Sequence, residues 1–294
     1  MNYYQTLLHK NGYLKIRSSL SADEISRMKE RLCELSKNQR VRQVSDLITD
    51  PDIQRILNDK NLKAVLHKLY DSPVFYPNLQ TQFNSFTQKI SFKRRFGLHI
   101  DGANELASRN DEFKEQIPTW TNVGFYFQDA HNSGYGGGIC GSVPLFKLVR
   151  SLFRLPFGFQ IAEIVLKVAK KISPDFLLPV IKTNAGDFVI FDNRFPHASS
   201  VGPKIMQSLK TNQNTKQTFL QNIPKENNKL VLYAFSGEQK HVDKVMKYNF
   251  LPSVKENVEK GDFDYREVVQ FCVNQHNKDY GIPFVSGILA EGDG

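Results

Sequence analysis

The segments of this chain with β-strand character lie far apart, and no regular crossover helix follows any of them. One runs from residue 74 to about 141 and is rich in Phe, Tyr, Val and Ile, with Gly and Asn between the short runs. Two more are "NAGDFVIFDN" (184–193) and "KLVLYAFSG" (229–237). Parallel strands need a crossover between them, so this pattern favours an antiparallel β-sandwich or barrel over a doubly wound sheet.

Helical segments flank the predicted β core. Ser21 is a candidate N-cap, with Glu24 three residues later as a capping box requires. Residues 53–71 predict one or two further helices with a break near Asn58. We therefore expect one mainly β domain with flanking helices over residues 1–294: N-terminal helices in 1–72, a β core in 74–240 with a helical insertion at 145–182, and a C-terminal helix in 264–278.

The insertion at 145–182 is basic and amphipathic on both sides of Pro156. Seven Lys or Arg and two Asp or Glu give it a net charge of +5, out of +9 for the chain. Apolar residues recur at helical spacing in each half: Leu145, Leu148, Val149, Leu152 and Phe153, then Ile161, Ile164, Val165, Val168 and Ala169. Two interpretations stay open. The helices pack on the sheet with solvated basic faces, or residues 145–172 contact an anionic membrane or cover a lipid-like substrate.

The cysteine content and the hydropathy of the chain indicate the cellular compartment in which the protein is expected. The three cysteines, Cys33, Cys140 and Cys272, are far apart and form no CxxC pair, which argues against a disulfide framework and against a thiolate zinc site. The start of the chain has no long apolar run typical of a secretory signal, and no stretch of about 18 apolar residues occurs. We therefore expect a cytoplasmic protein. If residues 145–172 contact a membrane, we expect that contact to be peripheral. Nucleic acid is disfavoured, because the basic residues are not interleaved with exposed aromatic residues.

Three residues predict a metal site. His99 and Asp101 stand at i and i+2 in "FGLHIDGANE"; on a strand they share one face, with Cα atoms about 6.6 Å apart. This pair alone is a weak signal. His197 follows the apolar run "DFVIFD" and adds a third ligand. Two histidines and one carboxylate on one side of a metal form the facial triad of non-haem Fe(II) oxygenases, which leaves coordination positions open.

Three blocks of sequence resemble the phytanoyl-CoA dioxygenase family of Fe(II)- and 2-oxoglutarate-dependent oxygenases. They are "FGLHIDGANE", "TWTNVGFYFQDAHNSGYGGGICGSVP" and "NAGDFVIFDNRFPHAS", and they lie between about Tyr76 and Gly237. The resemblance implies a double-stranded β-helix, a jelly-roll or cupin-like core, with iron held by His99, Asp101 and His197. It also implies Fe(II) as cofactor and 2-oxoglutarate as co-substrate.

The predicted 2-oxoglutarate site departs from that family. Its members commonly have an Arg after the distal histidine for the far carboxylate, whereas this chain has no Arg between Arg194 and Arg266. Lys229, which opens the strand "KLVLYAFSG", is the first candidate and Lys225 the substitute. Other residues predicted to line the keto acid or substrate cavity are Gln82, Trp120 and Asn122.

The resemblance implies hydroxylation of a small organic substrate. The basic, apolar insertion at 145–182 favours a substrate that is anionic or lipid-like. Asp101 favours hydroxylation over halogenation, because halogenating relatives lack this carboxylate and bind chloride there. The missing Arg leaves an alternative open: a non-catalytic β-barrel binding protein derived from this family.

Overall fold

The structure is a computed structural model that describes residues 1–35, 41–42, 50–84, 98–101, 116–118, 120–129, 139–171, 179–199 and 229–241. The helices are α1 (Tyr3–Asn11), α2 (Ala22–Leu35), α4 (Pro51–Leu57), α5 (Lys60–Leu69), α7 (Val143–Leu152), α8 (Gly158–Lys171) and the short 3-10 helix η5 (Gln239–His241). The strands are β1 (Tyr13–Arg17), β2 (Val41–Arg42), β3 (Pro73–Asn84), β4 (Trp120–Tyr126), β5 (Ile139–Gly141), β6 (Val180–Ile181), β7 (Asp187–Asp192), β8 (His197–Ser199) and β9 (Lys229–Glu238).

The strands form two antiparallel sheets. The larger one has the order β1-β7-β4-β9-β3-β2, and the smaller one has the order β6-β5-β8. Every pair is antiparallel, and most neighbours come from distant parts of the chain: β1 pairs with β7, and β4 lies between β7 and β9. The predicted antiparallel sheet with flanking helices is confirmed.

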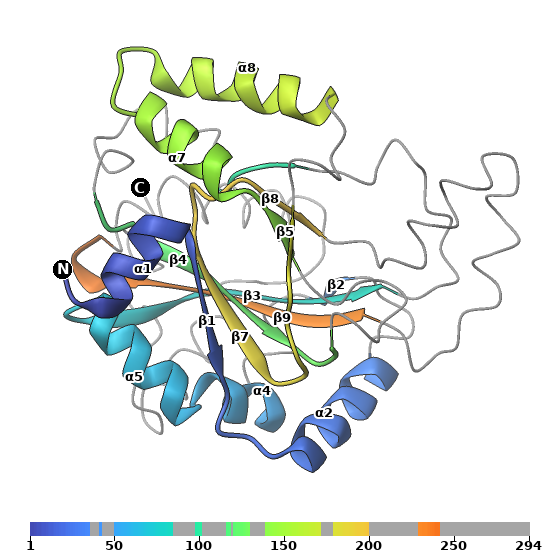
Figure 1. Cartoon of the computed structure of the whole chain (residues 1–294). Coiled ribbons are helices and arrows are strands. Elements are labelled where there is room, and N and C mark those ends of the chain that lie inside the picture. Colours follow the sequence, from blue (N-terminus) through green and yellow to red (C-terminus); the bar gives the residue numbers. More distant parts are fainter. Residues whose placement is uncertain are drawn as a thin grey trace, which may run out of the picture.

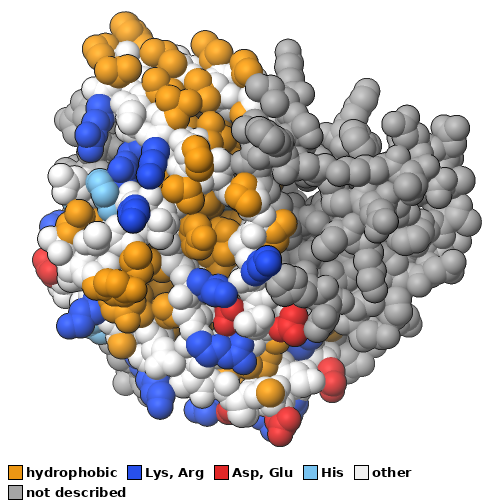
Figure 2. Space-filling model, in the orientation of Figure 1, with side chains coloured by type: hydrophobic (Ala, Val, Ile, Leu, Met, Phe, Trp, Pro, Cys, Tyr) orange, Lys and Arg blue, Asp and Glu red, His pale blue; other side chains and the backbone are white. Residues whose placement is uncertain are grey.

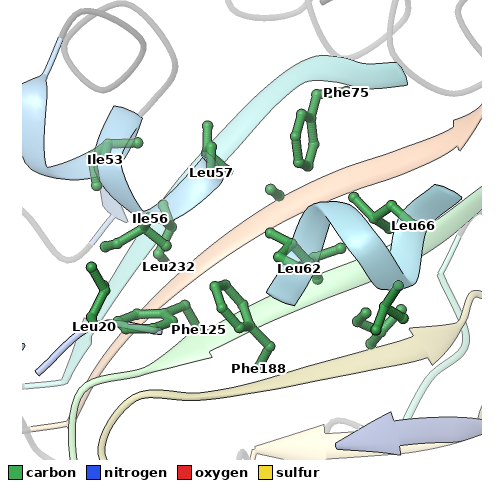
Figure 3. Packing of buried hydrophobic residues seen from close by; sticks show 14 of the residues in the cluster. Leu20, Ile53, Ile56, Leu57, Leu62, Leu66, Phe75, Phe125, Phe188 and Leu232 are labelled. Carbon is green, nitrogen blue, oxygen red and sulfur yellow. The ribbon is translucent and has the colours of Figure 1, made fainter. Parts of the chain in front are cut away.

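One face of the larger sheet is covered by α2, α4 and α5 (Figure 1). Alternate residues of the central strands point to these helices, as the two-residue period of a strand requires, and Phe125, Phe188 and Leu232 are examples. Figure 3 shows their side chains packed against helical residues such as Ile56 and Leu62. Full burial of each such side chain contributes about 1.5–3 kcal/mol, so this layer is a main source of stability.

The other residues of the same strands face the smaller sheet. Tyr126, Val189 and Val231 form a second buried cluster with Ile139 of β5 and Ile181 of β6. The two sheets are therefore joined by a core of their own, on the side of the larger sheet away from α2, α4 and α5. The space between the sheets is where side chains of β4, β7 and β9 can meet those of β8.

The N-terminal part of the chain forms the helices α2, α4 and α5, with the predicted capping box at Ser21 and a break at Asn58. Ser21 precedes α2, its backbone N–H donates to Glu24 Oε2 at 2.8 Å, and Glu24 N–H donates back to Ser21 Oγ at 3.3 Å. Asn58 is the C-cap of α4, and the side chain of Asp59 caps α5. Each such cap satisfies donors or acceptors that a helix end leaves open.

The helical insertion differs in one respect from its sequence pattern. Helices form on both sides of Pro156 as predicted, and α7 is buried through Phe146 and Val149. The stripe expected for α8 is buried only at its end, at Ala169, whereas Ile161, Ile164 and Val168 are exposed. The other buried residues of α8 include Ala162 and Leu166, which lie outside that stripe. Helical periodicity identifies an apolar face but does not say what covers it.

Within the described part of the chain, no helix is both long and apolar enough to cross a membrane. The predicted C-terminal helix at 264–278 and Lys225 lie outside the described residues.

Candidate metal centre

Two of the three predicted ligands are direct neighbours across a backbone bridge. His99 and His197 form an isolated antiparallel bridge, in which each N–H donates to the carbonyl oxygen of the other at 3.0 Å. Asp101 is not on a described strand but in a turn, and its N–H donates to the carbonyl oxygen of Asn193 at 2.9 Å. The chain near His99 is therefore tied at two points to the segment that carries His197.

The ligand atoms of this triad converge. One ligand atom from each of His99, Asp101 and His197 lies within 4.8 Å of the other two. The Nε2 atom of His99 is 3.4 Å from Asp101 Oδ1, and that of His197 is 3.5 Å from Asp101 Oδ2. Two ligands bound at about 2.1 Å and at right angles lie about 3.0 Å apart, so small side-chain movements complete the set.

Second contacts orient two of the ligands. The Nδ1 atom of His197 lies 2.9 Å from the carbonyl oxygen of Phe195, which fits a proton on Nδ1 and leaves Nε2 to bind a metal. The side-chain amide of Asn122 on β4 donates to Asp101 Oδ2. Such contacts set the tautomer of a ligand histidine and the rotamer of a ligand carboxylate.

The surroundings also set the protonation states. Burial raises the pKa of the Asp101 carboxyl, but His197, His99 and the Asn122 amide outweigh it and hold the pKa below its ordinary value. Burial, the largest cause, lowers the pKa of the His197 imidazole, and His99 adds to this effect. The carboxylate is charged and the imidazole neutral near pH 7, and these are the forms that bind a metal ion.

Accessibility differs among the three ligands. The side chain of His197 is 9% exposed and that of Asp101 is 24% exposed, whereas that of His99 is 53% exposed. The centre is thus buried on the side of the smaller sheet and accessible on the side of His99. A small molecule can approach a metal at this centre from the His99 side.

A buried ion pair shapes the turn that precedes His197. The side chains of Asp192 and Arg194 are 0% and 1% exposed. Arg194 Nε donates to Asp192 Oδ1 at 2.8 Å, and its Nη2 donates to Asp192 Oδ2 at 2.5 Å. The backbone N–H of Arg194 donates to Oδ1 as well, at 2.9 Å. This turn carries the carbonyls of Asn193 and Phe195 that hold Asp101 and His197.

Two tyrosines lie side by side on the face of the larger sheet that packs against the smaller sheet. A Cβ atom at Gly124 would lie 3.2 Å from the ring of Tyr126 and 3.2 Å from that of Tyr233, so both rings lie over this glycine. Burial raises the pKa of Tyr233 to about 12, with the Tyr126 hydroxyl lowering it and the charge of Asp101 raising it. The Tyr233 hydroxyl is therefore protonated near pH 7.

The other predicted site residues lie on the strands of the larger sheet. Trp120 is 1% exposed and its ring contacts that of Phe235, with centroids 5.6 Å apart. Gln82 is the register partner of Val231, and Lys229 begins β9 opposite Asn84. The register pairs Asn122 with Phe235. Phe235 lies six residues along β9 from Lys229, so about 20 Å of extended strand separates Lys229 from the position opposite Asn122.

Several residues around the centre were not predicted from the sequence. The turn that holds Asp101 and His197 is formed by Asp192, Asn193, Arg194 and Phe195. The only sequence signal for this turn is the pair of opposite charges two residues apart in "DNR". Tyr233 lies opposite Gly124 because β9 pairs with β4 in this register.

The comparisons concern the fold. Neither a scan against protein-family models nor a search of curated proteins finds a match. Among solved structures, apo HygX from Streptomyces hygroscopicus is similar with a TM-score of 0.53 at 14% identity, over 82% of this chain and 87% of that one. HygX with nickel, 2-oxoglutarate and hygromycin B bound gives 0.51 at 14% identity, over 81% and 88%.

AviO1 from Streptomyces viridochromogenes Tue57 gives a TM-score of 0.50 at 13% identity, over 80% of this chain and 94% of that one. At these identities the likeness concerns the fold, and it covers most of both chains. The resemblance to the phytanoyl-CoA dioxygenase family stays a prediction.

Proposed function

We propose that this protein is a non-haem Fe(II)- and 2-oxoglutarate-dependent dioxygenase that hydroxylates a small organic substrate. The observation that carries the proposal is the convergence of His99, Asp101 and His197 within 4.8 Å. A fold like that of HygX, which has been solved with iron and with nickel and 2-oxoglutarate bound, supports it. When bound to this triad, Fe(II) and 2-oxoglutarate supply the activation of dioxygen for C–H hydroxylation.

The chain itself provides binding and orientation. The Phe195 carbonyl sets the tautomer of His197, and the Asn122 amide sets the rotamer of Asp101. Both side chains are therefore oriented for metal binding by contacts within the protein. Three protein ligands leave further coordination positions for a chelating keto acid and dioxygen. The exposed side at His99 gives these molecules access, and the buried side at His197 limits water there.

Lys229, with Lys225 as the substitute, remains our proposal for the cation that pairs with the far carboxylate of 2-oxoglutarate. Trp120 and Gln82 remain proposed lining residues, whereas the Asn122 amide contacts Asp101. We propose the Tyr233 hydroxyl, in the cluster between the two sheets, as the second candidate donor to this carboxylate. If Lys229 holds the keto acid, Lys229→Ala raises the KM for 2-oxoglutarate more than Tyr233→Phe does. The reverse order would move this role to the tyrosine.

We also propose that the two facing sheets belong to one double-stranded β-helix in a single domain spanning residues 1–294. The substrate is an anionic or lipid-like molecule, and the protein acts in the cytoplasm. The phytanoyl-CoA dioxygenase family is the proposed family, on the sequence blocks that resemble it.

Anaerobic addition of Fe(II) and 2-oxoglutarate tests the proposal. We expect a weak visible charge-transfer band, its loss in His99→Ala, and its retention in the matched control His67→Ala on α5, away from the triad. A succinate-release assay against small acids, acyl thioesters and lipids then identifies the substrate class. No band in the unmodified protein refutes the proposal. A band without succinate release for any substrate supports the non-catalytic binding protein instead.

A further inference from the structure

We propose that the hairpin formed by α7 and α8 is a docking surface for membranes that contain anionic phospholipids. This inference does not depend on the metal centre, and it starts from apolar side chains that the fold leaves in solvent. On α8, Ile161, Ile164 and Val168 are 39%, 59% and 51% exposed. They follow one another at i, i+3 and i+7, so they form one continuous stripe along the helix.

The turn between the helices extends this apolar surface. Leu155 is 51% exposed, and Phe157 is 78% exposed, the highest exposed fraction among the large hydrophobic residues described. Figure 2 shows apolar side chains gathered over this end of the molecule, with Lys and Arg side chains beside them. In Figure 1, α8 is the outermost helix and α7 lies between it and the smaller sheet. The stripe therefore faces away from the body of the protein.

The backbone holds Phe157 in this position at a cost. Its φ is +58°, and it is the only residue other than glycine with a positive φ in the described part of the chain. The next residue must be glycine, because a Cβ atom at Gly158 would lie 1.8 Å from the carbonyl oxygen of Leu152. A glycine would also suit position 157 better than Phe does. A strained turn that presents a large apolar ring to solvent indicates a role outside the fold.

Charge complementarity identifies the partner. Residues 143–171 contain six Lys or Arg and one Glu, a net charge of +5. On α8, the exposed Lys167 stands three residues after Ile164, so its cation neighbours the stripe on the helix surface. Cations beside an apolar stripe are what a helix lying in an anionic lipid interface presents. An apolar protein partner would have no use for this charge.

Co-sedimentation of the full chain with lipid vesicles, without iron or 2-oxoglutarate, tests the proposal. We compare phosphatidylcholine vesicles containing about 30% phosphatidylserine with phosphatidylcholine alone. We expect binding to the anionic vesicles that is at least about tenfold tighter, and that weakens as salt is raised. No binding to the anionic vesicles, or equal binding to both kinds, overturns the proposal.

Single substitutions distinguish the contribution of individual side chains to vesicle binding from any effect on the stability of the fold. Phe157→Gly removes the ring and suits the positive φ, so we expect roughly tenfold weaker vesicle binding without a lower melting temperature. Lys167→Gln should weaken binding about fivefold. The matched control is Tyr3→Ala, which removes a 70% exposed aromatic ring on α1 and should leave binding unchanged.

Two results would contradict this assignment. One is unchanged vesicle binding in Phe157→Gly. The other is a dimer in sedimentation velocity that Phe157→Gly dissociates, because the hairpin would then be an interface between two copies of this chain.

Discussion

The buried pair of Asp192 and Arg194 gives the sharpest stability prediction. Asp192→Asn removes the charge of the carboxylate but keeps its shape. The guanidinium of Arg194, 1% exposed and bound at 2.5 and 2.8 Å, then faces a neutral amide in a site that water does not reach. Removing one partner of a buried ion pair costs about 3–5 kcal/mol. We expect a loss of about 3 kcal/mol, the lower end, because the amide oxygen still accepts hydrogen bonds.

Urea unfolding measures this loss. With a slope of about 3 kcal/mol per molar urea, a loss of about 3 kcal/mol lowers the midpoint by about 1 M. The matched control makes the same chemical change in an exposed pair: Glu163→Gln removes the ion pair with Lys167, whose side chain is 70% exposed, and should cost about 0.3–0.5 kcal/mol. A loss of under about 1 kcal/mol in Asp192→Asn would refute the reasoning about burial.

The same variant tests whether the turn positions the ligands. Because the turn carries the carbonyls of Asn193 and Phe195, its distortion should weaken the affinity of the folded protein for Fe(II) by about 10–100-fold. The double variant Asp192→Leu with Arg194→Met should recover much of the stability, since apolar replacements of a buried pair are often neutral. Normal Fe(II) affinity in Asp192→Asn, measured without urea, would show that the pair stabilises the fold without positioning the ligands.

Three further predictions follow from other contacts. Asn122→Leu removes the amide that holds Asp101, so Fe(II) affinity by anaerobic titration should fall about tenfold with little loss of stability; unchanged affinity would contradict the orienting role. Gly124→Ala places a Cβ atom 3.2 Å from the ring of Tyr233 and should cost about 1–3 kcal/mol in thermal unfolding, whereas an unchanged melting temperature would mean that the tyrosines move freely. Hydrogen bonds from the Ser21 backbone, then Arg55, lower the pKa of Glu24 from 4.5 to about 2. Its contribution to stability is present above pH 4.5 and lost as the pH falls towards 2, so the urea midpoint of Glu24→Gln should fall less over this interval; equal slopes would refute it.

The grouping of His99, Asp101 and His197 and the antiparallel topology could be predicted from the sequence because both leave local patterns. An HxD pair and a histidine after an apolar strand specify ligand types, and runs of β-type sequence without crossover helices limit the sheet to antiparallel pairing. The predicted capping box at Ser21 formed for the same reason, since its partners are three residues apart. Asn122 was predicted to line the cavity, whereas its amide contacts Asp101.

Features that depend on contacts between distant segments could not be predicted. The HxD pair was expected on a strand, but Asp101 lies in a turn whose position is set by the carbonyl of Asn193. The apolar stripe of α8 was recognised, but the sequence cannot say that most of it stays exposed while Ala162 and Leu166 are buried. The position of the Tyr233 ring beside Gly124 requires the register between β4 and β9, which no local signal specifies.

The bridge between His99 and His197 bears on when a metal ion can be captured during synthesis. The chain must close a loop of about 100 residues before these imidazoles meet, so a ribosome-bound chain that ends before His197 holds only two of the three ligands. If the triad holds iron as we propose, the complete site forms only in the late stage of biogenesis. An ion that binds the folded chain alone then stabilises it by mass action, and the fully translated protein becomes harder to unfold in proportion to the logarithm of the free metal concentration.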